Sequence, residues 1–140
     1  MVHFLFDTNV VLDFLMDRKP FSVHSAHLFT AADKGKLKAY VSAISFNNSY
    51  YVIEKSEGHK KAIYLIEQME SMFKTIDLTS LIINNAIKSG FSDFEDAIQF
   101  YSALSESKIQ AIVTRNVKDF KSKDILILTP EQAIKYLLLK

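Results

Sequence analysis

The chain has 140 residues, of which 49% are hydrophobic and 24% charged, with three Gly, two Pro and no Cys. This composition is typical of one globular domain with long regular elements, and it excludes disulfides, thiolate metal ligands and a cysteine nucleophile. The 17 Lys and Arg against 16 Asp and Glu give a formal net charge of +1, so any nucleic-acid partner requires a local patch or a metal ion.

The chain begins with a short apolar run over residues 2–6 that stops at a polar break, which predicts a buried strand. Apolar residues at helical spacing over 10–16 and 23–31 then predict two helices that form a helical hairpin. Thr8 or Asn9 is positioned to cap the first of these helices.

The second quarter of the chain repeats the strand-then-helix order. Residues 37–44 alternate as a second strand does, and Ser45 is positioned to cap the helix that follows. Two helices broken near Gly58 come next, and residues 73–78 predict a third strand.

The next stretch carries clear start and stop signals for helices. Thr79 starts a helix that stops at Gly90, and Ser92-Asp93-Phe94-Glu95 fits the capping box S-x-x-E at the start of another. Mostly apolar runs over 109–113 and 125–128 predict two further strands, each buried on both faces.

The last helix starts at Thr129-Pro130-Glu131-Gln132, a second capping box with Pro in the first turn. The alternation of strands and helices along the whole chain predicts an α/β sandwich built on a parallel sheet with right-handed crossovers.

The expected location is cytoplasmic. The N-terminus reaches Asp7 too soon for the apolar region of a signal peptide, and no apolar run approaches the roughly 18 residues that a membrane span needs. The absence of Cys also suits a reducing interior. We therefore expect a soluble protein with no membrane partner, folded as a single domain over residues 1–140.

Three distant stretches each place an aspartate where a strand stops or a helix opens, at Asp7, Asp96 and Asp119. The carboxyl ends of the central strands in an open parallel sheet border the crevice where ligands bind. Carboxylates gathered there repel one another unless a cation holds them, so the set predicts a Mg²⁺ or Mn²⁺ site. Such a cation would support hydrolysis of a phosphodiester bond.

Each aspartate also has a purely structural interpretation. Asp7 alone is better explained as a turn or capping residue. Asp93 shares a helix face with Asp96 and is a further candidate ligand, but an acidic residue in a first turn also stabilises the helix dipole. Glu95 is better explained as the capping partner of Ser92 than as a ligand.

Other polar residues near these aspartates are candidates for positioning substrate or water. They are Thr8, Asn9, Thr114, Arg115 and Asn116. The planar guanidinium of Arg115 could bind phosphate, and an ordinary salt bridge is an equally good explanation.

Lysines surround one of the three aspartates. Lys118, Lys121 and Lys123 lie close to Asp119 in the sequence and could meet a phosphate backbone, although such lysines are more often simply solvated.

The chain resembles a PIN domain, and more narrowly the VapC-type toxin ribonucleases of bacterial toxin-antitoxin pairs. Four segments carry this resemblance: Asp7-Thr8-Asn9-Val10-Val11-Leu12-Asp13, Val41-Ser42-Ala43-Ile44-Ser45, Asp93-Phe94-Glu95-Asp96-Ala97-Ile98-Gln99, and Val113-Thr114-Arg115-Asn116-Val117-Lys118-Asp119-Phe120. Each segment is weak alone, and together they are specific.

The resemblance implies a three-layer α/β/α sandwich with a central parallel sheet of four to five strands. It also implies an acidic Mg²⁺ or Mn²⁺ centre made by Asp7, Asp96 and Asp119, supported by Thr114 and Asn116. Single-stranded RNA would be the substrate, a cognate antitoxin would dock over the helical hairpin and the active cleft, and a homodimer would be expected.

One position departs from the family pattern. The helix after the second strand commonly carries a glutamate, and the position that aligns with it here is Asn48. An amide oxygen can still bind a metal or orient its water, but it brings no negative charge and should weaken cation binding.

Three functions follow, in order of preference. The first is a metal-dependent endoribonuclease, the toxin of a toxin-antitoxin pair. The second, motivated by Asn48, is a catalytically weak or inactive PIN-like module that binds RNA or a protein partner. The third, a phosphatase of the haloacid dehalogenase type, ranks low because it requires an aspartate where this chain has Asn9.

The final helix bears on the oligomeric state. Its end, Tyr136-Leu137-Leu138-Leu139, is more apolar than a terminal surface requires, which suggests a dimer contact. Leu137 and Leu138 could equally seal the sheet.

Overall fold

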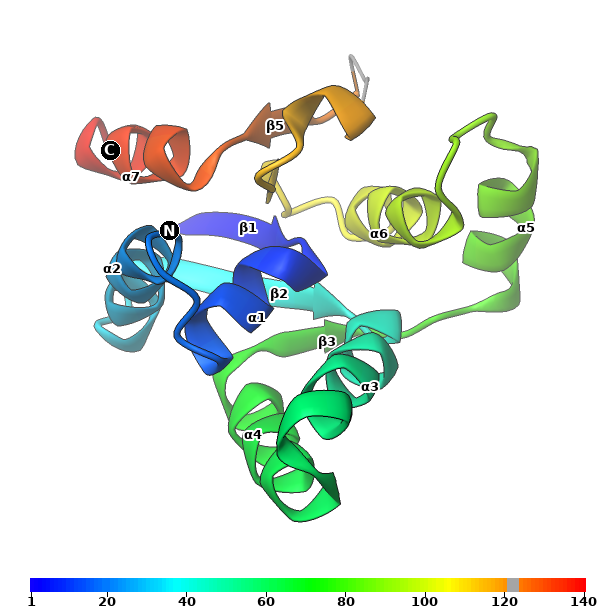
Figure 1. Ribbon diagram of the computed structural model, residues 1–140. Helices are drawn as coiled ribbons and strands as arrows, with labels where there is room; N and C mark the ends of the chain where they lie inside the picture. Colours follow the sequence, from blue (N-terminus) through cyan, green and yellow to red (C-terminus); the bar gives the residue numbers. More distant parts are fainter. Residues whose placement is uncertain (121–123) are drawn as a thin grey trace.

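A computed structural model describes residues 1–120 and 124–140, so that Lys121 and Lys123 lie outside the described residues. All strands of the central sheet run parallel, in the order β3-β2-β1-β4-β5 (Figure 1). The strands are β1 (Val2–Phe6), β2 (Leu37–Ser42), β3 (Lys74–Ile76), β4 (Ala111–Val113) and β5 (Leu126–Leu128).

Helices connect the strands in the order that the sequence predicts. They are α1 (Thr8–Leu15), α2 (Ser22–Asp33), α3 (Ile44–Glu57), α4 (His59–Met72), α5 (Ser80–Lys88), α6 (Phe94–Leu104) and α7 (Pro130–Leu138), with a 3₁₀ turn η1 (Val117–Phe120) between β4 and β5. No helix within the described ranges combines the length and apolar character needed to cross a membrane.

The central strand β1 shows why the sheet has helices on both faces. Its side chains alternate between the faces: Phe4 and Phe6 pack with residues of α1, α2 and α7, whereas Leu5 packs with Phe100 of α6 and Phe120 of η1. A parallel strand that is buried on both faces has a continuous run of apolar residues in its sequence, because neither set of alternating side chains is exposed to solvent. The predicted three-layer α/β/α architecture is confirmed, with five strands.

The helical hairpin and the helix break near Gly58 each depend on a residue with positive φ. Asp17, just after α1, has φ of 49°, a left-handed conformation that Asp tolerates better than most residues, and the chain turns there toward α2. Gly58 has φ of 84° and separates α3 from α4. Without a Cβ, glycine adopts this conformation at little steric cost.

Two predicted helix caps are confirmed. Thr129 Oγ1 accepts from Gln132 N (3.1 Å) while Gln132 Oε1 accepts from Thr129 N (2.9 Å), which is the reciprocal capping box. Thr79 Oγ1 accepts from Ile82 N at 3.2 Å and starts α5.

Three predictions about helix starts are wrong by a few residues. Asp7, rather than Thr8 or Asn9, occupies the position before α1, and Ala43, rather than Ser45, precedes α3. Asp93, rather than Ser92, caps α6. In the first two cases the predicted capping side chain bonds to another part of the chain: Thr8 bonds to Glu95 and Ser45 bonds to Thr8.

The prediction that both final strands are buried on both faces is right for β4 and wrong for β5. Ala111, Ile112 and Val113 are all fully buried. Leu126 is 45% exposed, because β5 lies at the edge of the sheet.

Candidate active site

The site lies at the carboxyl ends of β1 and β4, which are neighbours in the sheet. Asp7 follows β1, and its backbone N–H donates to the carbonyl of Val113 at 2.9 Å. Thr114 follows β4, and its Oγ1 donates to Asp7 Oδ2 at 2.8 Å across 107 residues of chain. The sheet therefore brings these two predicted residues together.

Helix α6 supplies the second hydrogen bond to Asp7. Gln99 Nε2 donates to Asp7 Oδ1 at 3.1 Å, and Gln99 Oε1 accepts from the backbone N–H of Thr8 at 3.0 Å. Asp7 is 4% exposed and Gln99 is fully buried. Burial raises the pKa of the Asp7 carboxyl, and the hydrogen bonds from Thr114 and Gln99 partly oppose this shift because they favour the ionised form.

Gln99 is a site residue that the sequence analysis missed, although it follows Asp96 by three residues and so shares its helix face. We expect Gln99→Ala to lower the free energy of unfolding by about 2–4 kcal/mol, because it removes the buried partner of Asp7 Oδ1 and of the Thr8 N–H. Chemical denaturation would measure this change.

The matched control for that variant is Gln68→Ala, at an exposed position on α4. It should change stability by less than about 0.5 kcal/mol. Equal stabilities of the Gln99→Ala and Gln68→Ala proteins would show that the Gln99 side chain does not hold Asp7 in place.

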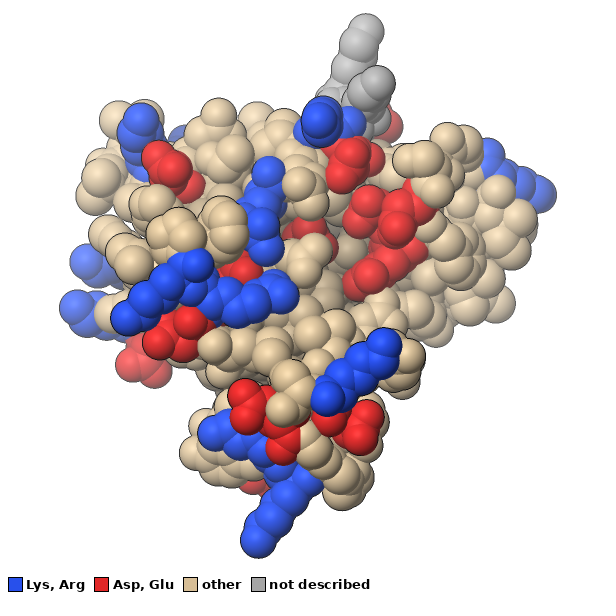
Figure 2. All heavy atoms as spheres, viewed as in Figure 1, with Lys and Arg blue, Asp and Glu red and all other residues tan. Residues whose placement is uncertain are grey.

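Asp96 lies in the first turn of α6 and is surrounded by other carboxylates. Desolvation, followed in order of size by the negative charges of Asp93, Asp7, Asp119 and Glu95, raises the pKa of Asp96 from 3.8 to about 7. Figure 2 shows Asp and Glu side chains gathered over α6 and toward η1. The charges of the other two predicted aspartates, Asp7 and Asp119, therefore both act on Asp96.

These carboxylates do not form a ready-made ligand cage. Within residues 1–120 and 124–140, no three His, Cys, Asp or Glu side chains are close enough together to hold a metal ion. The Asp7 carboxylate is held in place by its two hydrogen bonds, from Gln99 and Thr114. The remaining carboxylates have like charges, and their repulsion favours separation. Their oxygens nevertheless have the chemistry that Mg²⁺ or Mn²⁺ prefers.

The hydroxyl of Thr8 connects α1, α3 and α6. Its Oγ1 donates to Glu95 Oε2 at 2.6 Å and lies 2.7 Å from Ser45 Oγ. Because the single proton of Thr8 is given to Glu95, Ser45 is the donor to Thr8. Glu95 thus contacts the site, and the prediction that it caps Ser92 is wrong.

Asp93 has a structural task at the start of α6. Its Oδ1 accepts from the backbone N–H of Asp96 at 2.9 Å, which is the bond of an N-cap. This is the structural interpretation left open by the sequence. Its charge still acts on the site, since it is the strongest of the neighbouring charges that raise the pKa of Asp96.

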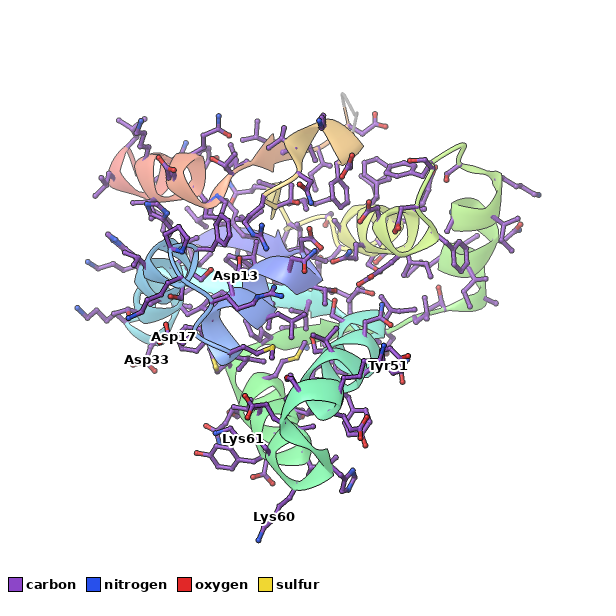
Figure 3. All side chains as sticks on the ribbon, in the orientation of Figure 1. Asp13, Asp17, Asp33, Tyr51, Lys60 and Lys61 are labelled. Carbon is purple, nitrogen blue, oxygen red and sulfur yellow. The ribbon has the colours of Figure 1, made fainter. Side chains whose placement is uncertain are left out.

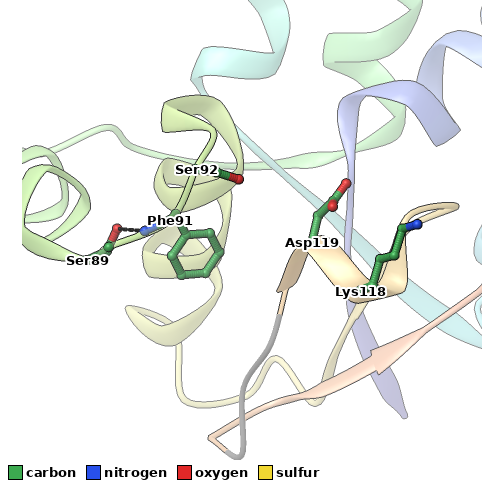
Figure 4. A pocket seen from close by; sticks show the side chains of 6 residues that line it. Ser89, Phe91, Ser92, Lys118 and Asp119 are labelled. Atoms are coloured by element: carbon green, nitrogen blue, oxygen red, sulfur yellow. Dashed lines mark hydrogen bonds between the residues drawn. The ribbon is translucent and has the colours of Figure 1, made fainter.

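Asp119 is exposed on η1, at the rim of a cavity of about 450 Å³. The cavity is lined by Ser89, Gly90, Phe91, Ser92, Lys118 and Asp119. In Figure 4, Asp119 and Lys118 lie on η1 at one side of this cavity, and Phe91 and Ser92 lie at the other side. The backbone N–H of Asp119 donates to the carbonyl of Asn116 at 3.0 Å.

Asn116 itself is exposed, and its backbone N–H donates to Thr114 Oγ1 at 3.0 Å. Thr114 is fully buried and links this loop to Asp7. The loop after β4 is therefore anchored to the acidic site through one hydroxyl.

Arg115 and Asn9 contact charged residues outside the group of carboxylates around Asp96, namely Asp13 and Arg18. Arg115 Nε lies 2.8 Å from Asp13 Oδ2 in an ion pair, and Asn9 Oδ1 accepts from Arg18 Nη2 at 3.3 Å. The ordinary salt bridge considered for Arg115 is therefore present, with Asp13 as its partner.

Asn48 is half-buried on α3. It follows Ser45 by three residues, and Ser45 contacts Thr8. Residues three apart share a helix face, so Asn48 lies on the side of α3 that faces the site.

Residues 3–118 of the chain match the PIN domain family. The chain therefore belongs to the PIN domain family, and the predicted resemblance is confirmed. This membership argues against the haloacid dehalogenase alternative. No curated protein sequence matches the chain.

A similar fold occurs in solved VapBC and toxin-antitoxin complexes. A chain of the DNA-bound VapBC complex from Salmonella typhimurium has 18% identity and a TM-score of 0.69, with 93% of this chain and 99% of that chain covered. A chain of a toxin-antitoxin complex from Klebsiella pneumoniae has 21% identity and a TM-score of 0.65, covering 90% and 96%.

A third similar structure is Mycobacterium tuberculosis VapC20, described as a toxin that cleaves the sarcin-ricin loop. It has 11% identity and a TM-score of 0.61, with 78% of this chain and 86% of that chain covered. At such identities the likeness concerns the fold. The α/β sheet between helices is thus one that VapC toxins share.

Proposed function

We propose that this protein is a metal-dependent endoribonuclease that hydrolyses phosphodiester bonds of single-stranded RNA and is the toxin of a toxin-antitoxin pair. The observation that carries the proposal is the electrostatic convergence at Asp96, whose pKa is raised to about 7 by burial and by the charges of neighbouring carboxylates that include Asp7 and Asp119. So much negative charge at the carboxyl edge of a parallel sheet is expensive unless it serves to bind a cation.

The donor set fits Mg²⁺ or Mn²⁺, because all of its members are hard carboxylate oxygens. The ion would be held by Asp7, Asp96 and Asp119, with Asp93 at the edge of this set. Asn48 would influence the affinity of the site for the ion. When bound, such an ion polarises a phosphoryl oxygen, generates a nucleophile from water at neutral pH and offsets charge on the leaving group.

The chain's own residues position this centre. Gln99 and Thr114 fix the orientation of the Asp7 carboxylate, one from each side. Thr8 holds Glu95 toward the site, and the loop carrying Asn116 is anchored through Thr114. Thr8, Asn9, Thr114, Arg115 and Asn116 remain candidates for positioning substrate or water.

The proposed substrate and partners have support from the similar structures. One of them is described as a toxin that cleaves the sarcin-ricin loop, and another is a toxin-antitoxin complex. For this chain we propose single-stranded RNA as the substrate, a cognate antitoxin as the partner, a homodimer as the assembly and the cytoplasm as the location, with residues 1–140 acting as one domain.

The direct test is cleavage of single-stranded RNA oligonucleotides with Mg²⁺ or Mn²⁺, with a chelator as the control. Fragments should form only when the cation is present.

The second candidate function, a PIN-like module that binds RNA or a protein without cleaving it, is favoured by Asn48. Titration calorimetry separates the two, because the module would take up no Mn²⁺ and yet retain RNA or a partner.

Asn48 offers a gain-of-function prediction. We expect Asn48→Glu to raise the affinity for Mn²⁺ roughly tenfold, because it adds a carboxylate on the helix face that meets Thr8 through Ser45. Calorimetric titration with Mn²⁺ measures the change. Asn47→Glu adds the same charge at an exposed neighbouring position of α3 and is the control. Equal affinities of the two variants would remove Asn48 from the site.

A further inference from the structure

A second charged cluster lies beside the acidic site. The carboxylate of Asp13, fully buried in α1, accepts from Arg18 Nε at 2.9 Å and from Arg115 Nε at 2.8 Å and Nη2 at 3.2 Å. One negative charge thus meets two positive charges. The cluster, formed by Asp13, Arg18 and Arg115, keeps a net charge of +1, the opposite sign to the site next to it.

Both arginines are attached to the segments that carry the acidic residues. Arg115 directly follows Thr114, which donates to Asp7. Arg18 Nη2 donates to the backbone carbonyl of Asn9 at 3.1 Å, two residues after Asp7. The cluster is therefore fixed relative to Asp7 through both strand ends.

The two guanidinium groups are held in place and still reach solvent. The ring of Phe21 lies under Arg115, with 3.9 Å between the guanidinium carbon and the ring centroid. The side chains of Arg115 and Arg18 remain 28% and 34% exposed. A guanidinium has five N–H donors, and Asp13 takes two from Arg115, so three are left for another acceptor.

The surrounding charges suggest what that acceptor is. Figure 2 shows a hollow with Lys and Arg side chains on one side, over α1 and α2, and Asp and Glu side chains on the other side, over α6. RNA is a polyanion, so carboxylates repel it unless positive charge is also nearby. A planar guanidinium fork matches two phosphate oxygens, which makes arginine well suited to binding the backbone.

We propose that Arg115 and Arg18 form a binding subsite for a backbone phosphate of single-stranded RNA, next to the acidic centre. The inference rests on the proposed function, because it supplies that function with a place for the substrate backbone. Asp13 is the positioning residue, since it orients both guanidinium groups.

The test measures RNA binding in a protein that does not cleave. A fluorescently labelled single-stranded RNA oligonucleotide is titrated with Asp7→Asn protein at several salt concentrations, and with the same protein carrying Arg115→Gln or Arg18→Gln. Each additional variant should bind roughly tenfold more weakly, and the slope of log affinity against log salt should fall by about 0.7 for each phosphate that the protein no longer binds.

Lys60→Gln in the same Asp7→Asn protein is the matched control. It removes one positive charge at the exposed start of α4, where Figure 3 shows Lys60 projecting away from the rest of the molecule. Its affinity and salt slope should stay close to those of the Asp7→Asn parent. If the arginine variants behave like Lys60→Gln, the phosphate subsite is overturned.

Loss of a partner for buried Asp13 can also weaken the fold, so a second variant is needed. Arg115→Lys keeps the charge beside Asp13 but loses the fork. It should unfold near the parent temperature and bind RNA several-fold more weakly. Binding equal to that of the parent would leave Arg115 with a structural role only.

Failure of the proposed function would give a different experimental result from failure of the phosphate subsite. In that case the wild-type protein cleaves no RNA with Mg²⁺ or Mn²⁺, whatever the RNA affinities of the Asp7→Asn parent and the arginine variants are. If the wild type cleaves, the parent binds and the arginine variants are unchanged, only the phosphate subsite fails.

Discussion

We expect the Asp7→Asn protein to lose RNA cleavage by a factor of roughly 10²–10³ or more and to remain folded. Asp7 is the most buried of the three aspartates, and its two oxygens are oriented by Gln99 and Thr114. An amide of the same shape removes the negative charge that a cation requires. Initial rates on a labelled oligonucleotide with Mn²⁺ measure the loss.

The fold should accommodate this substitution. The amide oxygen can accept from Gln99, and the amide group can donate to Thr114 Oγ1, whose hydroxyl is free to turn. Burial raises the pKa of Asp7, which means that the folded state favours its neutral form. At neutral pH we therefore expect the free energy of unfolding of Asp7→Asn to equal or exceed that of the wild type.

Asp33→Asn is the matched control for Asp7→Asn. Asp33 is exposed at the end of α2, and Figure 3 shows it at the periphery of the molecule. That variant should keep full activity. Full activity of Asp7→Asn itself would remove the central residue from the proposed reaction, whereas simultaneous loss of fold and activity would show that Asp7 has an unforeseen structural role.

The second large effect is a dependence of Mn²⁺ affinity on pH. The pKa of Asp96 is about 7, and a carboxyl must lose its proton before it binds a metal. The apparent affinity should therefore fall by up to about tenfold for each pH unit below 7, or about 100-fold at pH 5. Calorimetric titrations at pH 5.5, 6.5 and 7.5 would reveal it.

The stability of the metal-free protein should change in the opposite sense. The pKa of Asp96 rises from its ordinary value of 3.8 to about 7 in the folded state, so between these values the folded state binds more protons than the unfolded state. The free energy of unfolding consequently falls as the pH rises through this window. Asp7, whose pKa is also raised, acts in the same direction.

Asp96→Asn distinguishes this residue from the other carboxylates. The variant should lose most of the Mn²⁺ binding and much of the decrease in stability between pH 4 and 7, while Asp33→Asn should keep both. A Mn²⁺ affinity that is equal at pH 5.5 and 7.5 would contradict the assignment of Asp96 as a ligand with a raised pKa.

Much of the fold could be predicted from the sequence because its signals are local. The apolar run of β1 ending at Asp7, the capping box at Thr129 and the left-handed glycine at Gly58 each depend on residues within a few positions. Hydrophobic periodicity and capping are short-range effects, so they appear directly in the sequence. A predicted helix start differed from the observed one where the polar side chain bonds to a residue distant in the sequence, as Ser45 bonds to Thr8.

The candidate site divides in the same way. The sequence by itself determined which aspartates follow strands or open helices, and the common sheet edge then brought Asp7 toward Thr114 across 107 residues. Only the tertiary structure decided that Gln99 holds Asp7 across 92 residues, that Glu95 turns to Thr8 and that Arg115 pairs with Asp13. Such partners are selected by packing of whole elements, because a buried polar group must bond to whatever donor or acceptor the fold places beside it.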